Sequence, residues 1–217
     1  MASEPARLVT VSASYGAGGS VVAPALARRL GVPFLHRATT STGEFVTPVP
    51  CAEQLAPDEV DTTPAHRLLA SLAHAMPVGP ALSPPSSRHQ DEILRRECEE
   101  GIRALAATGA GVILGRGAAV LLGKDTGFHV RLDGPPGPRL VQGGTIEGVD
   151  DEQARSRMEA ADRARVAYVR RLYRTDPADP GHYHLVIDST AMPLDAVTDI
   201  IAQALAVFSA PVAAAGR

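Results

Sequence analysis

The sequence contains little of what marks several common classes of protein. It has no tryptophan, and aromatic residues make up only 4% of the chain, so its core is expected to consist of alanine, valine and leucine. Two cysteines, Cys51 and Cys98, form neither a CxxC pair nor a metal-ligand pattern, which predicts reduced thiols rather than a zinc site or a disulfide. No apolar run approaches the roughly 18 residues of a membrane helix. Since no signal-peptide core is present either, we expect a cytoplasmic protein without a membrane partner.

An excess of positive charge is also missing. The formal net charge is −3, which argues against general binding to nucleic acid, because such binding needs a basic surface. The chain has 217 residues, of which 45% are hydrophobic. That is enough for one α/β domain with a smaller mobile part. No pattern in the sequence specifies an oligomeric state.

The most informative stretch lies near the N-terminus. Residues 8–11 are apolar and β-branched and predict a buried strand. A turn rich in glycine follows at 15–20, and residues 21–30 predict a helix. A strand, a glycine turn and a helix N-terminus together form an anion cradle, because backbone N–H groups converge there and the helix dipole favours negative charge.

The pattern of this turn departs from the common phosphate loop G-x-x-x-x-G-K-[ST]. Ala13 takes the first glycine position, Gly18 the second, Gly19 the lysine position and Ser20 the hydroxyl position, so two of the four fixed positions fit. The missing lysine matters because that side chain normally reaches the β- and γ-phosphates. The spacing alone is therefore compatible with a phosphate site or with a plain strand-to-helix turn.

The rest of the chain alternates between apolar strands and helices. Residues 38–64 lose periodicity, 74–90 form a proline-rich loop, and 137–150 are predicted to be loop with a helix start near Pro138 as the alternative. We expect strands at 8–11, 32–36, 112–114, 128–132 and 185–187, and helices at 21–30, 65–75, 91–107, 118–122, 151–173 and 193–207.

Such alternation predicts a parallel sheet covered by helices on both faces. Ligands of these sheets bind at the carboxyl ends of the strands. Four segments should gather there: residues 12–20, Gly115–Gly117, Asp133 and Asp188–Thr190. Asp133 ends its strand either as a Walker-B-like acid or as the cap of a turn.

A long helix predicted at 151–173 is rich in arginine. Seven arginines lie between 155 and 174, and most of them are expected on a solvated or partner-binding face. Arg165 differs, because helical spacing places it on the apolar stripe with Met158 and Tyr168. An arginine directed inward needs an anionic partner, and a phosphate bound by the guanidinium is one such partner.

Taken together, four stretches resemble the cytidylate kinase-like family, a branch of the P-loop nucleoside monophosphate kinases. They follow the family in order along nearly the whole chain, and the family's tyrosine-glycine-x-glycine-glycine loop has no lysine at the position of Gly19. The stretches are residues 11–20, residues 30–37, residues 111–118, and residues 162–190 with Asp162, Arg163, Arg165, Tyr168, Asp179, Pro180 and Tyr183.

The resemblance implies a three-layer P-loop NTPase fold with a parallel five-stranded sheet. It implies one cytidylate kinase-like domain over residues 1–217, with an acceptor-side insertion at 38–90 and an arginine-rich lid at 137–182. The implied activity is transfer of the γ-phosphoryl group of ATP, with Mg²⁺, to a nucleoside monophosphate of the CMP kind or a related small molecule.

The resemblance also assigns roles to residues. Ser20 is expected to coordinate Mg²⁺ through its hydroxyl. Arg116 and Arg37 are expected to hold the acceptor, and Arg165, Arg163 and Arg116 to act in catalysis. The ATP phosphates are expected at the residues of the loop and the first helical turn: Tyr15, Gly16, Ala17, Gly18, Gly19, Ser20 and Val21.

Two positions depart from the family pattern. Ala13 stands where the family usually has arginine, and His36 stands where it usually has aspartate. Both departures favour the alternative of a degenerate module that binds or senses a nucleotide without turnover. Arg116 and the arginine-rich helix favour an enzyme. No Asn-Lys-x-Asp motif is present, which argues against a GTPase.

Overall fold

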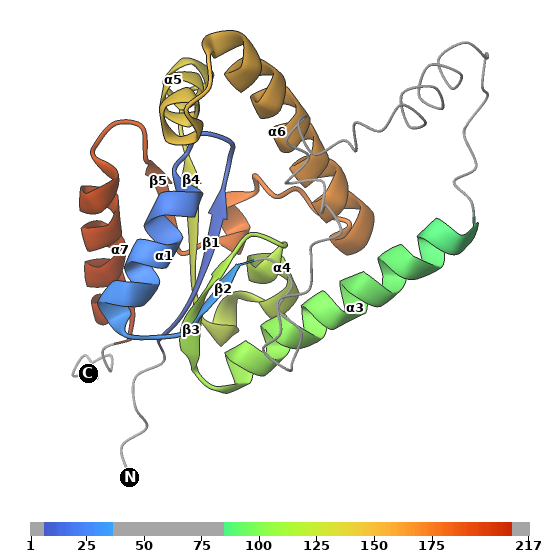
Figure 1. Cartoon of the computed structure of the whole chain (residues 1–217). Helices are drawn as coiled ribbons and strands as arrows, with labels where there is room; N and C mark the ends of the chain where they lie inside the picture. The colour runs from blue at the N-terminus through green and yellow to red at the C-terminus, as the bar shows by residue number, and fades with distance from the viewer. Residues whose placement is uncertain (1–6, 37–84, 210–217) are drawn as a thin grey trace.

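The computed structural model describes residues 7–36 and 85–209 of the chain. Within these ranges, five parallel strands form one sheet in the order β2-β3-β1-β4-β5 (Figure 1). The predicted parallel sheet is therefore confirmed. The strands are β1 (Arg7–Ala13), β2 (Phe34–His36), β3 (Ala110–Leu114), β4 (Phe128–Asp133) and β5 (Leu185–Asp188).

The central strand β1 is buried on both faces, which explains its nearly continuous apolar sequence. Val9 pairs with Val112 of β3 on one side and with Phe128 of β4 on the other. The chain leaves β1 toward β3 and β2 and later returns on the other side with β4. The carboxyl end of β1 is thus the point where the strand order switches, which is where open α/β sheets bind ligands.

Helices cover both faces of the sheet, so the molecule has three layers with the sheet in the middle (Figure 1). On one face, α1 and α7 pack together and bury Leu26 and Ile201 against the strands. On the other face, Ile102 of α3 and Ala118 of α4 pack with Leu8 and Ile113. These helices are α1 (Gly19–Leu30), α3 (Pro85–Ala107), α4 (Ala118–Leu122) and α7 (Leu194–Phe208).

Two further helices stand over the carboxyl edge of the sheet (Figure 1). They are α5 (Pro136–Glu147) and α6 (Asp151–Tyr173), and they contact each other. Gly148, with φ of +66°, ends α5, and the side chain of Asp150 caps α6 by accepting the N–H of Gln153. We refer to α5 and α6 together as the lid helices. Short 3₁₀ turns lie at Lys124–Thr126 and Pro180–His182.

Two predictions about loops are wrong for a common reason. Residues 137–150 are largely helical, so the predicted loop is wrong there and the alternative of a helix start near Pro138 is confirmed, with the start at Pro136. Helix α3 begins at Pro85 rather than at Asp91. In both places a proline lies at the start of the helix, where its missing N–H would have no intrahelical acceptor. The predicted helix at 65–75 and the irregular segment at 38–64 lie outside the described residues. Among the helices that are described, none is long and apolar enough to cross a membrane.

Candidate functional site

The glycine turn between β1 and α1 adopts a conformation that requires glycine. Gly16 and Gly18 have φ values of +71° and +76°, in the left-handed region. A Cβ atom at Gly16 would lie 1.9 Å from the carbonyl oxygen of Arg139, on α5. The backbones of the turn and of α5 are therefore in direct contact at Gly16, and no side chain fits between them.

The two later glycines lie in tight packing contacts. A Cβ at Gly18 would lie 2.5 Å from the Cδ2 atom of Leu194, at the start of α7, and one at Gly19 would lie 2.5 Å from the Cβ of Ala13. At neither position would an added Cβ atom point into open space. A residue larger than glycine at either position would push against α7 or β1.

The turn still presents backbone donors. Ala17 donates to the carbonyl of Ser14, and the first helical bonds of α1 end on the carbonyl of Gly18. The N–H groups of the glycines at 16, 18 and 19 and of Ser20 donate none of the hydrogen bonds between described residues. Together with the positive end of the α1 dipole, these donors are compatible with the anion cradle that the sequence predicts, and binding of a phosphate there stays a prediction.

The cradle opens toward solvent at the start of α1, where Ser20 and Val21 are exposed. The Ser20 hydroxyl is thus accessible to an ion that is held with a phosphate. Within the described residues, no cluster of three His, Cys, Asp or Glu side chains forms a metal site. A Mg²⁺ ion bound here would accordingly take most of its ligands from phosphate oxygens and water.

Side chains of α5 hold the turn in place. Arg139 Nη1 donates to the carbonyl of Tyr15 at 3.0 Å, and Gln142 Nε2 donates to the carbonyl of Gly16 at 2.8 Å. The buried Tyr15 ring reaches Glu147, whose Oε2 atom accepts the phenol at 2.9 Å. Burial and the adjacent Glu147 carboxylate raise the pKa of this phenol. Because loop was predicted at 137–150, these contacts between α5 and the turn were not expected from the sequence.

Arg165 points inward, as its place on the apolar stripe predicts. Its side chain is only 13% exposed, and its Nη1 atom donates to Asp162 Oδ1 at 2.9 Å. The anionic partner that an inward arginine requires is thus found in the chain itself. The side chain of Arg163 is exposed. Its predicted contact with a transferring phosphate would require the lid helices to move, and it stays a prediction.

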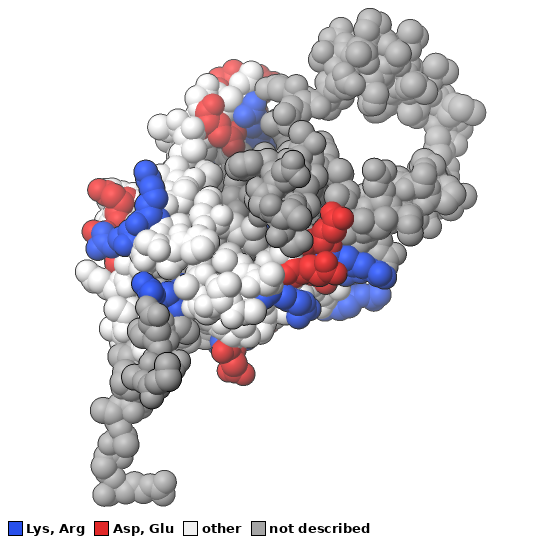
Figure 2. Space-filling model, turned by 60° about the horizontal axis from the view of Figure 1, so that its bottom comes forward, with Lys and Arg blue, Asp and Glu red and all other residues white. Residues whose placement is uncertain are grey.

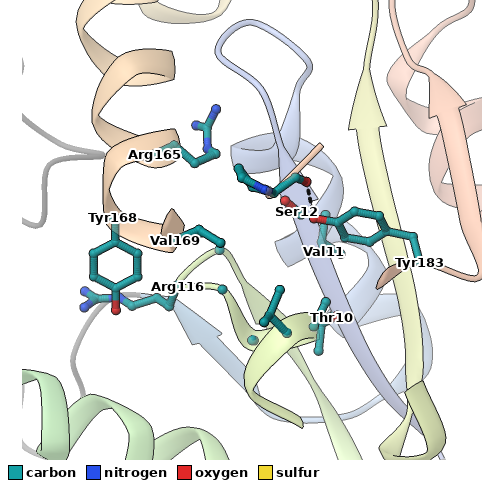
Figure 3. Close-up of a pocket in the computed structure, with 14 residues that line it drawn as sticks. Thr10, Val11, Ser12, Arg116, Arg165, Tyr168, Val169 and Tyr183 are labelled. Atoms are coloured by element: carbon teal, nitrogen blue, oxygen red, sulfur yellow. Dashed lines mark hydrogen bonds between the residues drawn. The ribbon is translucent and has the colours of Figure 1, made fainter. Parts of the chain in front are cut away.

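A cleft lies at the carboxyl ends of β1 and β3, and Thr10–Ser12 and residues 115–120 are among those that line it. Figure 3 shows Arg165 extending from α6 at the cleft and Thr10–Ser12 on β1, while the guanidinium of Arg116 points away toward Tyr168. The remaining wall is mostly apolar or aromatic and comes from residues 117–120, Tyr168, Val169, Pro177 and Tyr183.

Arg116 is held in an unusual backbone conformation in this cleft. Its φ of +59° is rare for a residue with a side chain. Its Nη1 atom lies 3.3 Å from the Sγ atom of Cys98 on α3 and donates to it. The expected position of Arg116 at the end of a buried strand is confirmed, whereas its role toward an acceptor stays a prediction. Arg37, the other predicted acceptor residue, lies outside the described residues.

A buried ion pair behind the glycine turn was missed. Arg131 of β4 donates to Asp133 Oδ2 at 2.7 Å, to Ser14 Oγ at 3.1 Å and to the carbonyl of Pro177 at 3.0 Å. Burial alone would raise the pKa of Asp133, but the hydrogen bonds and charge of Arg131 outweigh it and hold that pKa below its usual range. Asp133 also accepts the N–H of Gly134, so it caps the turn as one of the two alternatives predicted. A charged residue within an otherwise apolar strand was the available signal.

The sheet order, the glycine turn and the two lid helices define an α/β protein of the P-loop kinase type. The sequence profile of the cytidylate kinase-like family matches residues 8–191. The chain therefore belongs to the cytidylate kinase-like family. No curated protein matches the sequence significantly.

Solved structures resemble the chain to different degrees. An uncharacterized protein from Eubacterium ventriosum ATCC 27560 superposes with a TM-score of 0.62 at 19% identity, covering 92% of this chain and 98% of that one. Shikimate kinase from Acinetobacter baumannii gives a TM-score of 0.45 at 15% identity, covering 94% and 96% of the two chains. Deoxyadenosine kinase from M. mycoides gives 0.45 at 10% identity, covering 91% and 98%. Scores below 0.5 add nothing to the argument about function.

Proposed function

We propose that the protein is a kinase that transfers the γ-phosphoryl group of ATP to a small-molecule acceptor, with a nucleoside monophosphate of the CMP kind as the first candidate. The observation that carries this proposal is the joining of two features at one sheet edge. The N–H groups at Gly18–Ser20 donate no hydrogen bond between described residues and would form a phosphate cradle, and a cleft with Arg116 and Arg165 in its lining lies at the carboxyl ends of β1 and β3. Both belong to one domain, residues 1–217, with the acceptor-side segment at 38–90 and the lid at 137–182.

In this proposal the triphosphate lies on the turn at Tyr15–Val21. Its oxygens accept the backbone N–H groups, and Ser20 contributes its exposed hydroxyl to the Mg²⁺ that accompanies ATP. No lysine is present at Gly19 to neutralise the γ-phosphate. Positive charge from other segments would come from Arg139, which donates to the carbonyl of Tyr15, and from Arg165; both arginines contact Asp162.

The acceptor would occupy the cleft. A phosphate on the acceptor would be bound by the guanidinium of Arg116, with Arg37 as a second cation, while the apolar and aromatic wall takes the remainder of the molecule. One acceptor oxygen forms the new bond to the γ-phosphorus, the bond to the β–γ bridging oxygen breaks, and ADP leaves. Arg165, and Arg163 when the lid moves, would stabilise the charge in the transition state.

A binding module without turnover is the second candidate. Ala13 is the observation that favours it, because its methyl group packs 2.5 Å from the place of a Cβ at Gly19 and supplies no charge. In that case ATP would bind and ADP would not be released.

The deciding experiment is a coupled ADP-release assay with Mg²⁺-ATP across a panel of nucleoside monophosphates and other small alcohols. The kinase proposal expects turnover that depends on one acceptor class. Ser20→Ala should abolish this turnover, whereas Ser20→Thr, which keeps a hydroxyl, should retain it. Binding of ATP by calorimetry with no ADP release for any acceptor would favour the binding module.

A further inference from the structure

One carboxylate of the lid reaches the glycine turn itself. Asp162 Oδ1 accepts the backbone N–H of Tyr15 at 2.9 Å, across 147 positions of sequence. The same oxygen accepts Arg165 Nη1 at 2.9 Å, and Oδ2 accepts Arg139 Nη1 at 2.7 Å. Donors from the turn, from α5 and from α6 thus converge on a single negative group.

These three donors are of the kind that a phosphate oxygen uses. A backbone N–H beside a helix N-terminus and two guanidinium groups form the usual surroundings of a bound phosphate. An anion that enters the cradle and also uses the N–H of Tyr15 would share these donors with the Asp162 carboxylate or replace it. Repulsion between the two negative charges opposes sharing, because they would lie within a few ångströms of each other.

Replacement of the Asp162 carboxylate by a phosphate requires little change in the structure. The Asp162 side chain is 31% exposed, so it can turn toward water without leaving a charge buried. Arg139 would stay in place, because the carbonyls of Gly134 and Tyr15 also accept its N–H groups, each at 3.0 Å. The cradle thus keeps a cation for the incoming anion after the carboxylate has left.

We propose that Asp162 is a built-in competitor for the phosphate site: the lid's own carboxylate occupies the N–H of Tyr15 and the two arginines beside it, and a nucleotide phosphate that takes these donors displaces it. This inference rests on the proposed function insofar as that function makes the turn a phosphate site. The displacement couples ligand binding to the lid, because it breaks the direct hydrogen bond between α6 and the turn.

Two other roles for Asp162 lead to opposite expectations. If it positions Arg165 and Arg139 for the substrate, removing its charge weakens phosphate binding. If it only pins the lid, removing its charge lowers stability and leaves phosphate affinity unchanged. A competitor differs from both, since its removal strengthens binding.

The test is Asp162→Asn in the full chain, which keeps size and an acceptor oxygen but removes the charge. Titration calorimetry with Mg²⁺-ATP, and separately with inorganic tripolyphosphate, should show a Kd lower by roughly 5- to 20-fold, the effect of releasing a site that is occupied most of the time. Tripolyphosphate isolates the phosphate cradle from any contact to a base. Asp162→Ala is the second variant and should act in the same direction.

Two control variants make the result specific. Glu159→Gln also removes one lid carboxylate, but Glu159 is exposed on α6, so affinity should change less than about twofold, as expected for general charge alone. Asp150→Ala removes the cap of α6 and should weaken that helix without strengthening binding.

Each outcome decides between these roles. Equal or weaker phosphate binding in both Asp162 variants overturns the proposal, and so does an equal gain in Glu159→Gln. If neither the parent protein nor the variants bind ATP or tripolyphosphate, the phosphate site itself is absent and both proposals fail. Tighter binding in the variants without any turnover supports the competitor and overturns only the kinase.

Discussion

Replacing Gly16 by alanine tests the close approach between the turn and α5. The backbone at Gly16 is left-handed, as it is at Gly31, the C-cap of α1, where φ is +63°. Alanine in this region costs about 1 kcal/mol relative to glycine. A Cβ at Gly31 meets nothing within 4 Å. Gly31→Ala is therefore a matched control that carries the same conformational cost without an overlap.

At Gly16 a second cost is added. The new Cβ would lie 1.9 Å from the backbone carbonyl oxygen of Arg139, and no side-chain rotation can relieve such an overlap. The two backbones must separate, which strains or breaks the hydrogen bonds from Arg139 to Tyr15 and from Gln142 to Gly16. With about 1 kcal/mol for each bond, the expected loss is about 3 kcal/mol in the free energy of unfolding, against about 1 kcal/mol at Gly31.

Urea unfolding followed by circular dichroism measures this difference. The m-value should be similar in both variants, so the midpoints can be compared directly. Gly16→Ala should also lose binding of tripolyphosphate, since the N–H groups of the turn would no longer converge, whereas Gly31→Ala should bind normally. Equal destabilisation of the two variants, or intact phosphate binding in Gly16→Ala, would refute the argument that the turn and α5 are held at contact distance.

Three further predictions concern charge. Arg165→Met should lower kcat much more than it weakens ATP binding, because the lost contact forms in the transition state, whereas Arg155→Met on the exposed face should leave both unchanged in the ADP-release assay. Arg116→Ala should raise the KM of the acceptor by at least about tenfold and leave the Kd of ATP within about twofold, and loss of ATP binding instead would contradict its assignment. Burial lowers the pKa values of His129 and His184, so the folded state binds fewer protons than the unfolded state. Stability should therefore be full above the unfolded value of about 6.5 and fall as pH drops through that value toward the lowered folded values, which urea midpoints at about pH 5 and about pH 7.5 would detect.

Charge on the surface gives little guidance to function. On the face shown in Figure 2, basic and acidic side chains are interspersed among uncharged ones, and the described residues there form no continuous basic area. The basic residues that bear on function lie within the site, where Arg131, Arg139 and Arg165 each have an acidic partner. Composition alone could not separate these paired arginines from those on the outer face of α6.

The sequence by itself determined the sheet and the cradle. An apolar run followed by glycines predicts β1 and the turn. A strand that is buried on both faces is apolar at nearly every position, and the left-handed backbone at residues 16 and 18 requires glycine. Helical spacing placed Arg165 inward for an equally local reason. Local rules failed at α5, where prolines at 136 and 138 and glycines at 143 and 144 suggested loop.

Only the tertiary structure decided what these segments contact. Gly143 is tolerated in α5 because a Cβ there would meet the Tyr15 ring at 2.5 Å, and no local pattern reveals that ring. Likewise, Asp162 looks in the sequence like an acid that balances an arginine-rich helix. Its hydrogen bond to the N–H of Tyr15 joins segments 147 residues apart. The periodicity of a sequence indicates only which face of a helix or strand is buried. Which residues contact each other across such long sequence separations is decided by how the lid helices pack on the edge of the sheet.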